Sequence, residues 1–396
     1  TDVSSLIFDD GASLAFAGSN LYATSTDSDT THTKFYLRKF NSDASYTGVS
    51  STRTEAGGAQ FGLTSIETGA DGNLYMVWGS TNSGVLVYDL GLNLLADADY
   101  AGLDLAVQSS TIAYVTTLQG SDALVVRAVL SAAGGGSSPA HTFTGTFAGA
   151  DGADITSSNG FNNVGKFVVI DTNTAGGPFV YVTFSATTSA IGGGGAAVGG
   201  IVRYDASGAF LSSVTVQGTR GADGVVQDSA GNIYFADALP TIPSGQQPLG
   251  DNFITKYSKD LAFISSVALN THNIGPLVYD GTYIYAHADG YQGSWLVKLN
   301  TNLAVQASAQ YANHGNGNGG VLDGSGNIFV TAASWTPGAS WDFVLLKYSS
   351  TGVLLWERRY NGPGNGTDRP RALGVDGSGN VYLSGESAGS STSLDY

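Results

Sequence analysis

Five histidines are the residues of this chain best suited to acid–base chemistry or zinc binding. A zinc enzyme needs several imidazoles that converge on one point. The histidines instead fall at different phases of the repeat described below, and this scatter predicts surface histidines rather than a metal or catalytic site. The five are His32 and His141 in connecting loops, His287 at the end of a strand, and His272 and His314 just before strands.

Aspartates recur at the start of turns of the form Asp-Gly-x-Gly-Asn or a shorter relative. An aspartate in that position bonds the backbone amides of its own turn, which explains the recurrence without a ligand. Oxygen-rich loops also hold Ca²⁺, but none of these turns has the ordered ligand spacing of an EF-hand. We therefore expect no cofactor, with Ca²⁺ permitted but not indicated. The recurring aspartates are Asp71, Asp228, Asp280, Asp323 and Asp376.

Four aromatic residues form the best candidate ligand surface. Trp335 and Trp341 bracket a short Thr-Pro-Gly-Ala-Ser loop, and Tyr291 with Trp295 occupies the equivalent gap one repeat earlier. Exposed aromatic rings stack on sugars, so this pattern would suit a glycan. The alternative is that the rings fill gaps between repeats. The sequon at Asn365 is a candidate glycosylation site.

The overall composition excludes several classes of function. The net charge is −16, from 32 acidic and 16 basic residues, so the surface repels nucleic acid and anionic lipid. No apolar stretch reaches the ~18 residues that a membrane-spanning helix requires. The chain has no cysteine, and it begins at Thr1 with a single methionine in total. We expect an exported, processed protein that is extracellular or held at the cell surface.

A repeat runs through the chain with an average spacing of roughly 50 residues. Each copy has a turn built from Asp, Gly and Asn, which tolerate the left-handed backbone of a tight hairpin. The residues after the turn alternate apolar with small or polar and are rich in Tyr, Phe, Val and Ile, as in a half-buried strand. Each copy therefore predicts a hairpin. The eight copies are residues 18–22, 71–75, 110–114, 177–181, 228–234, 280–285, 321–330 and 375–383.

A second element follows most hairpins after a variable gap. In residues 201–205, 254–258 and 345–349, apolar residues precede Lys or Arg and then Tyr, which predicts a third strand. A fourth strand follows, as in residues 261–268. Four antiparallel strands repeated about eight times are the composition of a β-propeller. We predict a single all-β domain over residues 1–396, a propeller of four-stranded antiparallel blades, seven or eight in number.

The C-terminal repeats have the most specific sequence. Residues 364–385 closely resemble the SBBP β-propeller repeat family of bacteria and archaea. Lys347 and Tyr348 in the third strand, and the fourth strand with Trp356, are also similar to that family. The resemblance is strong over residues 317–396 and weakens towards the N-terminus. It implies an exported, repeat-built propeller, often part of a surface or adhesive protein, and it implies no catalytic residue.

The two ends of the chain bear on how the ring closes. The last copy, residues 371–396, is expected to be an incomplete blade, and residues 1–10 contain an apolar run that can supply a missing strand. This run either closes its own ring, which is then completed by strands from both chain ends, or completes the blade of a neighbouring molecule and builds a filament. The residues expected to act in closure or donation are Val3, Leu6, Ile7, Phe8, Leu394 and Tyr396.

Two functions remain open at this point. The first is a non-enzymatic extracellular or cell-surface propeller that serves binding or structural assembly, with itself, a surface glycan or a protein as its partner. The alternative is a propeller lyase or glycan-active hydrolase with its site at one mouth of the ring. An enzyme requires acids or histidines from several blades at one face, whereas the acids here lie in repeated turns. We expect the first function.

Overall fold

Short strands separated by turns of Gly, Asn and Asp make up the computed structural model of this chain, as the alternating repeat predicts. Strands in the described part of the chain are numbered β1 to β30 in sequence order. The structure describes residues 13–28, 32–56, 63–78, 85–98, 104–109, 112–119, 122–129, 139–143, 161–171, 177–188, 197–207, 209–217, 224–236, 253–269, 271, 273–290, 293–311, 315–335 and 341–387.

The strands form consecutive sheets, and the first four sheets cover the N-terminal half of the chain. Sheet 1 contains β1 (Leu14–Ala17), β2 (Asn20–Ser28), β3 (His32–Asn41) and β4 (Tyr46–Ala56). Sheet 2 contains β5 (Leu63–Thr68), β6 (Leu74–Trp78), β7 (Val85–Tyr88) and β8 (Leu94–Ala98). Sheet 3 contains β9 (Asp104–Ser109), β10 (Ile112–Gln119), β11 (Asp122–Val129) and β12 (Pro139–Phe143). Sheet 4 contains β13 (Phe161–Asp171), β14 (Phe179–Thr188), β15 (Ala197–Asp205) and β16 (Phe210–Gln217).

The remaining sheets continue in the same order. Sheet 5 contains β17 (Val225–Gln227), β18 (Ile233–Ala236), β19 (Phe253–Tyr257) and β20 (Phe263–Ala268). Sheet 6 contains β21 (Asn273–Tyr279), β22 (Tyr283–Gly290), β23 (Gly293–Asn300) and β24 (Val305–Tyr311). Sheet 7 contains β25 (Gly315–Leu322), β26 (Ile328–Trp335), β27 (Trp341–Tyr348) and β28 (Leu354–Tyr360). Sheet 8 contains β29 (Arg369–Val375) and β30 (Val381–Glu386).

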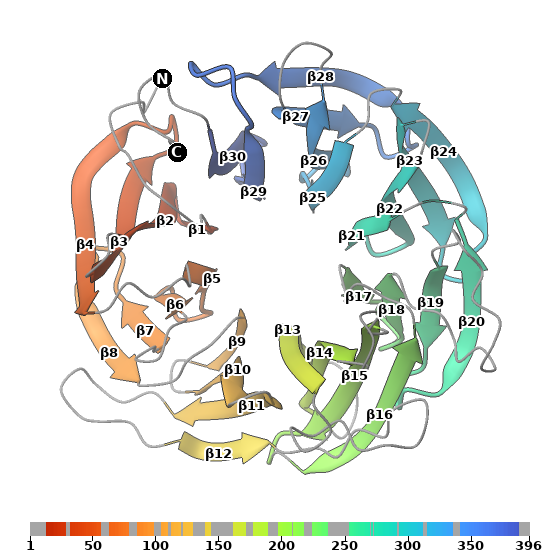
Figure 1. The fold of residues 1–396 in the computed structure, drawn as a ribbon, viewed down its shortest axis with the longest axis horizontal. Coiled ribbons are helices and arrows are strands. Elements are labelled where there is room, and N and C mark those ends of the chain that lie inside the picture. Colours follow the sequence, from red (N-terminus) through yellow and green to blue (C-terminus); the bar gives the residue numbers. More distant parts are fainter. Residues whose placement is uncertain are drawn as a thin grey trace.

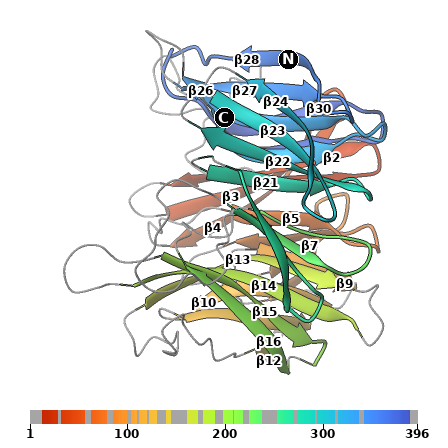
Figure 2. The same cartoon turned by 90° about the vertical axis from the view of Figure 1, so that its right-hand side faces the viewer.

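The chain folds as an all-β propeller of four-stranded antiparallel sheets. Among the described residues, seven sheets have four strands in sequence order and the eighth has two. The sheets are arranged radially around a central axis, with the first strand of each four-stranded sheet innermost and the fourth at the circumference (Figure 1). The strands run between the two faces of the ring, so the turns that join them collect at those faces (Figure 2). The predicted four-stranded repeat is therefore confirmed.

The turns between third and fourth strands share one backbone feature. Ala44, Leu92, Leu261 and Leu303 have positive φ angles of 62° to 64°, a region that non-glycine residues rarely adopt. In each of these turns the amide of that residue donates to a carbonyl three residues earlier, as from Leu92 to Asp89 at 3.0 Å. The three leucines are at most 7% exposed, so burial of their side chains accompanies the strained backbone.

The hydrophobic core lies between neighbouring sheets. One buried cluster joins Tyr285 and Leu296 of sheet 6 to Val330, Leu346 and Tyr348 of sheet 7. Because side chains of a strand alternate between its two faces, each inner sheet packs against both neighbours.

The residues predicted to act in ring closure or strand donation lie near the two chain ends. Residues 1–10, with Val3, Leu6, Ile7 and Phe8, lie outside the described residues, as do Leu394 and Tyr396.

The prediction that His32 and His141 lie in connecting loops was wrong, because the strands extend beyond the turn motifs. His32 begins β3, paired with Ala56, and His141 lies in β12, paired with Arg127. In the part of the chain that is described, no helix is long and apolar enough to span a membrane.

Candidate functional site

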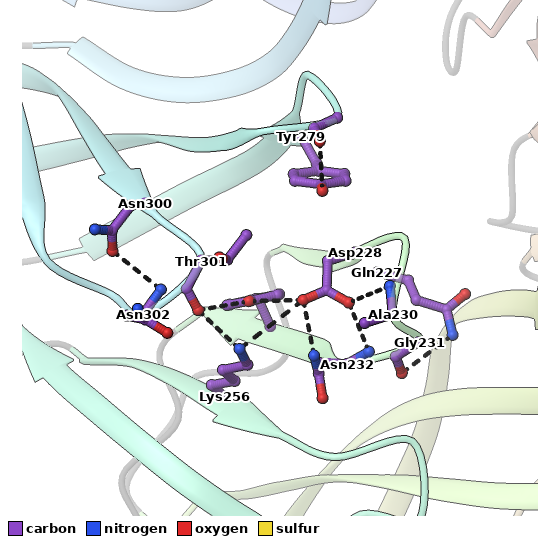
Figure 3. Close-up of polar contacts among 12 residues, drawn as sticks. Gln227, Asp228, Ala230, Gly231, Asn232, Lys256, Tyr279, Asn300, Thr301 and Asn302 are labelled. Carbon is purple, nitrogen blue, oxygen red and sulfur yellow. Dashed lines mark hydrogen bonds and ion pairs between the residues drawn. The ribbon is translucent and has the colours of Figure 1, made fainter.

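The aspartate that opens each hairpin turn organises a small polar network. In sheet 5, Asp228 Oδ1 accepts hydrogen bonds from the backbone amides of Ala230 and Asn232, both at 2.9 Å (Figure 3). Asp228 Oδ2 accepts from the Asn232 side chain and from the Tyr234 hydroxyl, both at 2.9 Å. One carboxylate therefore closes the turn and also fixes the tyrosine of the next strand.

The same arrangement recurs in other sheets, which confirms that these aspartates cap their own turns. Partial burial acts to raise the pKa of Asp323, but hydrogen bonds from Asn327 and Ser325 outweigh it, so that pKa lies below its ordinary value. Asp71 and Asp376 follow the same balance. Tyrosine hydroxyls donate to these carboxylates from Tyr75 to Asp71 at 2.8 Å, from Tyr285 to Asp280 at 2.8 Å and from Tyr382 to Asp376 at 3.0 Å.

A lysine on the third strand extends this network to the next sheet. Lys256 Nζ and the Tyr234 hydroxyl both donate to the carbonyl oxygen of Thr301, each at 2.8 Å (Figure 3). Thr301 lies in the turn between β23 and β24 of sheet 6. Lys256 Nζ also lies 5.2 Å from the centre of the Tyr234 ring and 3.9 Å from Asp228 Oδ2. We call this pair of hydrogen bonds from one sheet to the turn carbonyl of the next the Tyr–Lys contact.

The Tyr–Lys contact recurs around the ring. Between sheets 4 and 5 an arginine replaces the lysine and bonds the neighbouring turn through Asp260 instead, from Arg203 Nη1 at 2.5 Å. The remaining observed hydrogen bonds of this kind are Tyr22 and Lys39 to the Leu90 carbonyl at 2.9 and 3.0 Å, Tyr285 and Lys298 to the Ser350 carbonyl at 2.9 and 2.7 Å, and Tyr181 to the Lys259 carbonyl at 2.8 Å.

The last sheet makes the tyrosine half of this contact with the first. The Tyr382 hydroxyl donates to the carbonyl of Ser42, which lies in the turn between β3 and β4. The Tyr382 ring also packs on Phe16 of β1, with centroids 5.1 Å apart. At Gly374 a Cβ atom would lie 3.1 Å from Phe16 Cζ and closer still to Cε2. Glycine at this position therefore leaves room for the Phe16 ring. Sheets 8 and 1 therefore share the tyrosine-to-carbonyl hydrogen bond that joins consecutive sheets.

The chemistry of this network is that of hydrogen-bond donors held in place. Burial, and then the hydrogen bond to the neighbouring aspartate, raises the pKa of Tyr234 and of Tyr285 above the ordinary value. Both phenols therefore remain protonated donors at ordinary pH and are poor bases or nucleophiles. The arrangement suits a structural role at each sheet junction.

The structure describes the backbone of three of the four predicted aromatic residues. Trp295 is half-buried and packs on the cluster between sheets 5 and 6, with Ile284 and Val297. Trp341 is half-buried at the start of β27 and is the backbone partner of Trp335. Tyr291 lies outside the described residues. The position of Trp295 agrees with the alternative that these rings fill gaps between sheets.

The predicted glycosylation residue lies in the segment between sheets 7 and 8. Asn365 is exposed and has a positive φ of 48°. Its amide donates to the Gly362 carbonyl at 3.0 Å, and its Oδ1 accepts from the Asn361 side chain at 3.0 Å. An oligosaccharide transferase can reach such a turn, so glycosylation of Asn365 stays a prediction.

One histidine departs from the predicted surface location. His287 of β22 is 1% exposed, and neither ring nitrogen has a hydrogen-bond partner. Burial lowers the pKa of His287 to about 4. The carboxylate of Asp289 lies nearby, with His287 Nδ1 3.9 Å from Asp289 Oδ1. The prediction of a surface histidine was wrong here, because the hairpin of β22 and β23 carries His287 into the junction with sheet 7.

The remaining two histidines are not described, and the described residues show no cluster of metal-ligating side chains. His272 and His314 lie outside the described residues. Within the described residues, no group of three or more His, Cys, Asp or Glu side chains is placed to hold a metal ion.

Sequence reasoning missed the Tyr–Lys contact, although its signal was present. The Tyr after each turn and the Lys or Arg of each third strand recur together, as Tyr234 with Lys256 and Tyr285 with Lys298. We interpreted both as strand-forming residues. Their joint recurrence with a fixed partner turn one repeat later was the pattern that would have revealed the contact.

Comparison with known proteins supports the fold and nothing finer. No family model and no curated protein matches the chain. Among solved structures, Sqt1 from Chaetomium thermophilum has a TM-score of 0.55 at 10% identity, over 93% of this chain and 89% of that one. A streptogramin B lyase has 0.47 at 11% identity, over 81% and 89%. A putative 6-phosphogluconolactonase from Bacteroides uniformis has 0.47 at 15% identity, over 82% and 92%. At such low identities the likeness shows the propeller fold alone.

Proposed function

We propose that this chain is a non-enzymatic, extracellular or cell-surface β-propeller that serves binding or structural assembly. One observation carries the proposal: the polar residues that recur in the repeat are used to join neighbouring sheets. Asp228, Tyr234 and Lys256 all meet within one such junction (Figure 3). A repeat that commits its acids, amines and phenols to internal hydrogen bonds is suited to a rigid scaffold, with function placed on its surface or edges.

The proposal extends to the ring itself. We infer that the repeats are of the SBBP type, that the eight sheets are eight blades and that the ring closes between the first and last of them. The hydrogen bond from Tyr382 to Ser42 and the packing of Phe16 on Tyr382 support closure at this point. Sheets from both ends of the chain then form the closing junction.

Two kinds of partner fit this scaffold. A second copy of the chain is one, and it is developed below. The other is a surface glycan or protein that binds near Trp341, a half-buried residue at the start of β27. The charge of −16 makes a polyanionic partner unfavourable.

Light scattering and electron microscopy of the full chain, with a glycan array, test the function. We expect ordered assemblies, saturable glycan binding, or both, without turnover of polysaccharides. For glycan binding, Trp341→Ala should weaken affinity by at least about tenfold. Trp295→Ala, in the core between sheets 5 and 6, is the matched control that should alter stability but not affinity. A monomer that binds no partner and cleaves a polysaccharide would overturn the proposal.

A further inference from the structure

Among the described residues, sheet 8 ends at its second strand, β30, whereas the other sheets have four strands. In each of the other seven sheets the second strand pairs with a strand on both sides, as β26 pairs with β25 and β27. Among the described residues, β30 pairs with β29 alone. A strand edge of this kind presents backbone amides and carbonyls that another strand can pair with.

The face of sheet 7 turned towards this edge is also uncovered. A Cβ at Gly385 of β30 would meet Phe343 of β27, so Phe343 and its cross-strand partner Tyr360 face sheet 8. The residue of sheet 6 equivalent to Tyr360 is Tyr311. Tyr360 pairs with the residue four positions before Lys347, and Tyr311 pairs with the residue four positions before Lys298. Tyr311 is 4% exposed beneath sheet 7, whereas Tyr360 is 47% exposed. The described strands of sheet 8 therefore leave the outer part of this face open.

The Tyr–Lys contact is also not seen between the described residues of sheets 7 and 8. Phe329 stands at the position that carries tyrosine in the other seven copies, so no hydroxyl is available there. Lys347 instead lies 3.5 Å from Asp323 of its own sheet and 4.8 Å from the centre of the Phe329 ring. Among the described residues, this junction is therefore held without a hydrogen bond from the tyrosine position to a turn of the next sheet. The seven tyrosines are Tyr22, Tyr75, Tyr114, Tyr181, Tyr234, Tyr285 and Tyr382.

An exposed arginine lies on the face of sheet 7 that carries Trp356 and Tyr360. The guanidinium of Arg358 lies over the Trp356 ring at 5.1 Å, and Arg358 is exposed. In a chain of net charge −16, an exposed arginine beside the open face favours an acidic partner strand.

One segment of the chain has the complementary chemistry. Val3, Leu6, Ile7 and Phe8 form an apolar run, and the run is flanked by Asp2, Asp9 and Asp10 with no basic residue among residues 1–10. Sheets 8 and 1 already meet through Phe16, Ser42, Gly374 and Tyr382.

We propose that the edge of β30 and the adjoining face of sheet 7 accept the apolar segment of residues 3–8 from a second copy of this chain. The incoming strand pairs with β30 and covers Tyr360 and Trp356, and its flanking aspartates lie near Arg358. The inference rests on the proposed role in assembly and names the surface that assembly uses. Because donor and acceptor lie on different surfaces, the contact is head-to-tail and repeats from copy to copy.

The absence of cysteine from the chain allows a direct test. Two full-length single variants are prepared separately, Ile7→Cys on the donor and Leu383→Cys on β30, then mixed and oxidised. We expect a disulfide-linked heterodimer on a non-reducing gel, with Leu6→Cys and Phe8→Cys as alternative registers. Ser265→Cys on β20, at the edge of a complete sheet, is the matched control and should give no heterodimer. Circular dichroism of each variant checks that it is folded.

Each outcome bears on the proposal. Failure of all three donor variants to link to folded Leu383→Cys would overturn it. So would a disulfide that forms only within one chain of an Ile7→Cys/Leu383→Cys double variant, because the segment would then close its own ring. Assemblies seen by light scattering without this cross-link would leave the proposed function standing and refute only this surface. Independently, Arg358→Glu should weaken assembly about threefold, and Asp9→Arg in the same chain should restore it.

Discussion

The junction between sheets 6 and 7 and the junction between sheets 7 and 8 use equivalent strands in different ways. In the first, Tyr285 and Lys298 of sheet 6 bond the Ser350 carbonyl of sheet 7. In the second, Phe329 replaces the tyrosine and Lys347 pairs within its own sheet. Both junctions exist, so the Tyr–Lys contact fastens neighbouring sheets but is not required to bring them together.

What the two junctions do share is close packing, achieved with different residues. Between sheets 6 and 7 a buried polar layer includes His287, and Arg359 Nη2 bonds the Tyr311 hydroxyl at 2.7 Å and Ser334 Oγ at 3.2 Å. Between sheets 7 and 8, Phe343 lies directly against the backbone at Gly385. The first junction encloses a histidine whose pKa is lowered by burial, and the second depends on the absence of a side chain.

The largest expected effect comes from filling the space at Gly385. A Cβ there would lie 2.8 Å from Phe343 Cζ and 2.9 Å from Pro370 Cα, too close for the packing to remain. Gly385→Ala should lower the free energy of unfolding by about 3 kcal/mol, measured by urea denaturation. Gly324→Ala, where a Cβ would have nothing within 4 Å, is the control and should be near neutral. Equal values for the two variants would contradict the described packing.

Acid should weaken the junction between sheets 6 and 7 through His287. The ordinary pKa of histidine is 6.5, and burial lowers that of His287 to about 4. Between these values the unfolded chain binds the proton and the folded chain does not. Stability therefore falls as pH drops from 6.5 towards 4, by up to about 3 kcal/mol, and this contribution is constant above 6.5.

Replacing His287 with the residue that other sheets carry at the equivalent position isolates its contribution to the pH dependence of stability. His287 lies two residues after the tyrosine of its strand, where other sheets carry Thr24, Thr183 and Thr331. His287→Thr should flatten the dependence of unfolding free energy on pH across this window, measured by urea denaturation from pH 4 to 7. An unchanged slope would show that His287 is not buried as a neutral residue.

The Tyr–Lys contact should have a smaller effect. Tyr285→Phe removes the hydroxyl bonded to Ser350 and Asp280, while Lys298 still donates to the same carbonyl. We expect a loss of about 1 kcal/mol in the free energy of unfolding, measured by urea denaturation. A neutral result would mean that the lysine alone is sufficient.

The reciprocal change should have the smallest effect. Phe329→Tyr adds the missing hydroxyl where the described residues of sheet 8 offer no turn carbonyl. We expect a change below about 0.5 kcal/mol in the same assay. A gain of about 1 kcal/mol or more would show that the junction between sheets 7 and 8 does provide an acceptor, and would remove the contrast between the two junctions.

The sequence predicted the strands and turns because both are local properties. Asp376 and Asn380, for example, occur at the spacing that lets the aspartate accept two bonds from that asparagine. Which sheet faces which side chain is not local. Alternation alone could not show that His287 is enclosed by sheet 7. It could not show that Trp295 packs towards sheet 5 while Phe343 faces sheet 8.

The hydrogen bond from each tyrosine to the following sheet also has a consequence for the order in which the protein is made. The bonds from Tyr22, Tyr234 and Tyr285 span 68, 67 and 65 residues, so each hydroxyl leaves the ribosome before its acceptor has been synthesised. The bond from Tyr382 spans 340 residues and reaches back to a turn made at the start. Closing the longer loop costs about 1.4 kcal/mol more in chain entropy than closing the shorter one. Sheets 1 to 7 can therefore dock one after another during translation, whereas the ring waits for its last repeat.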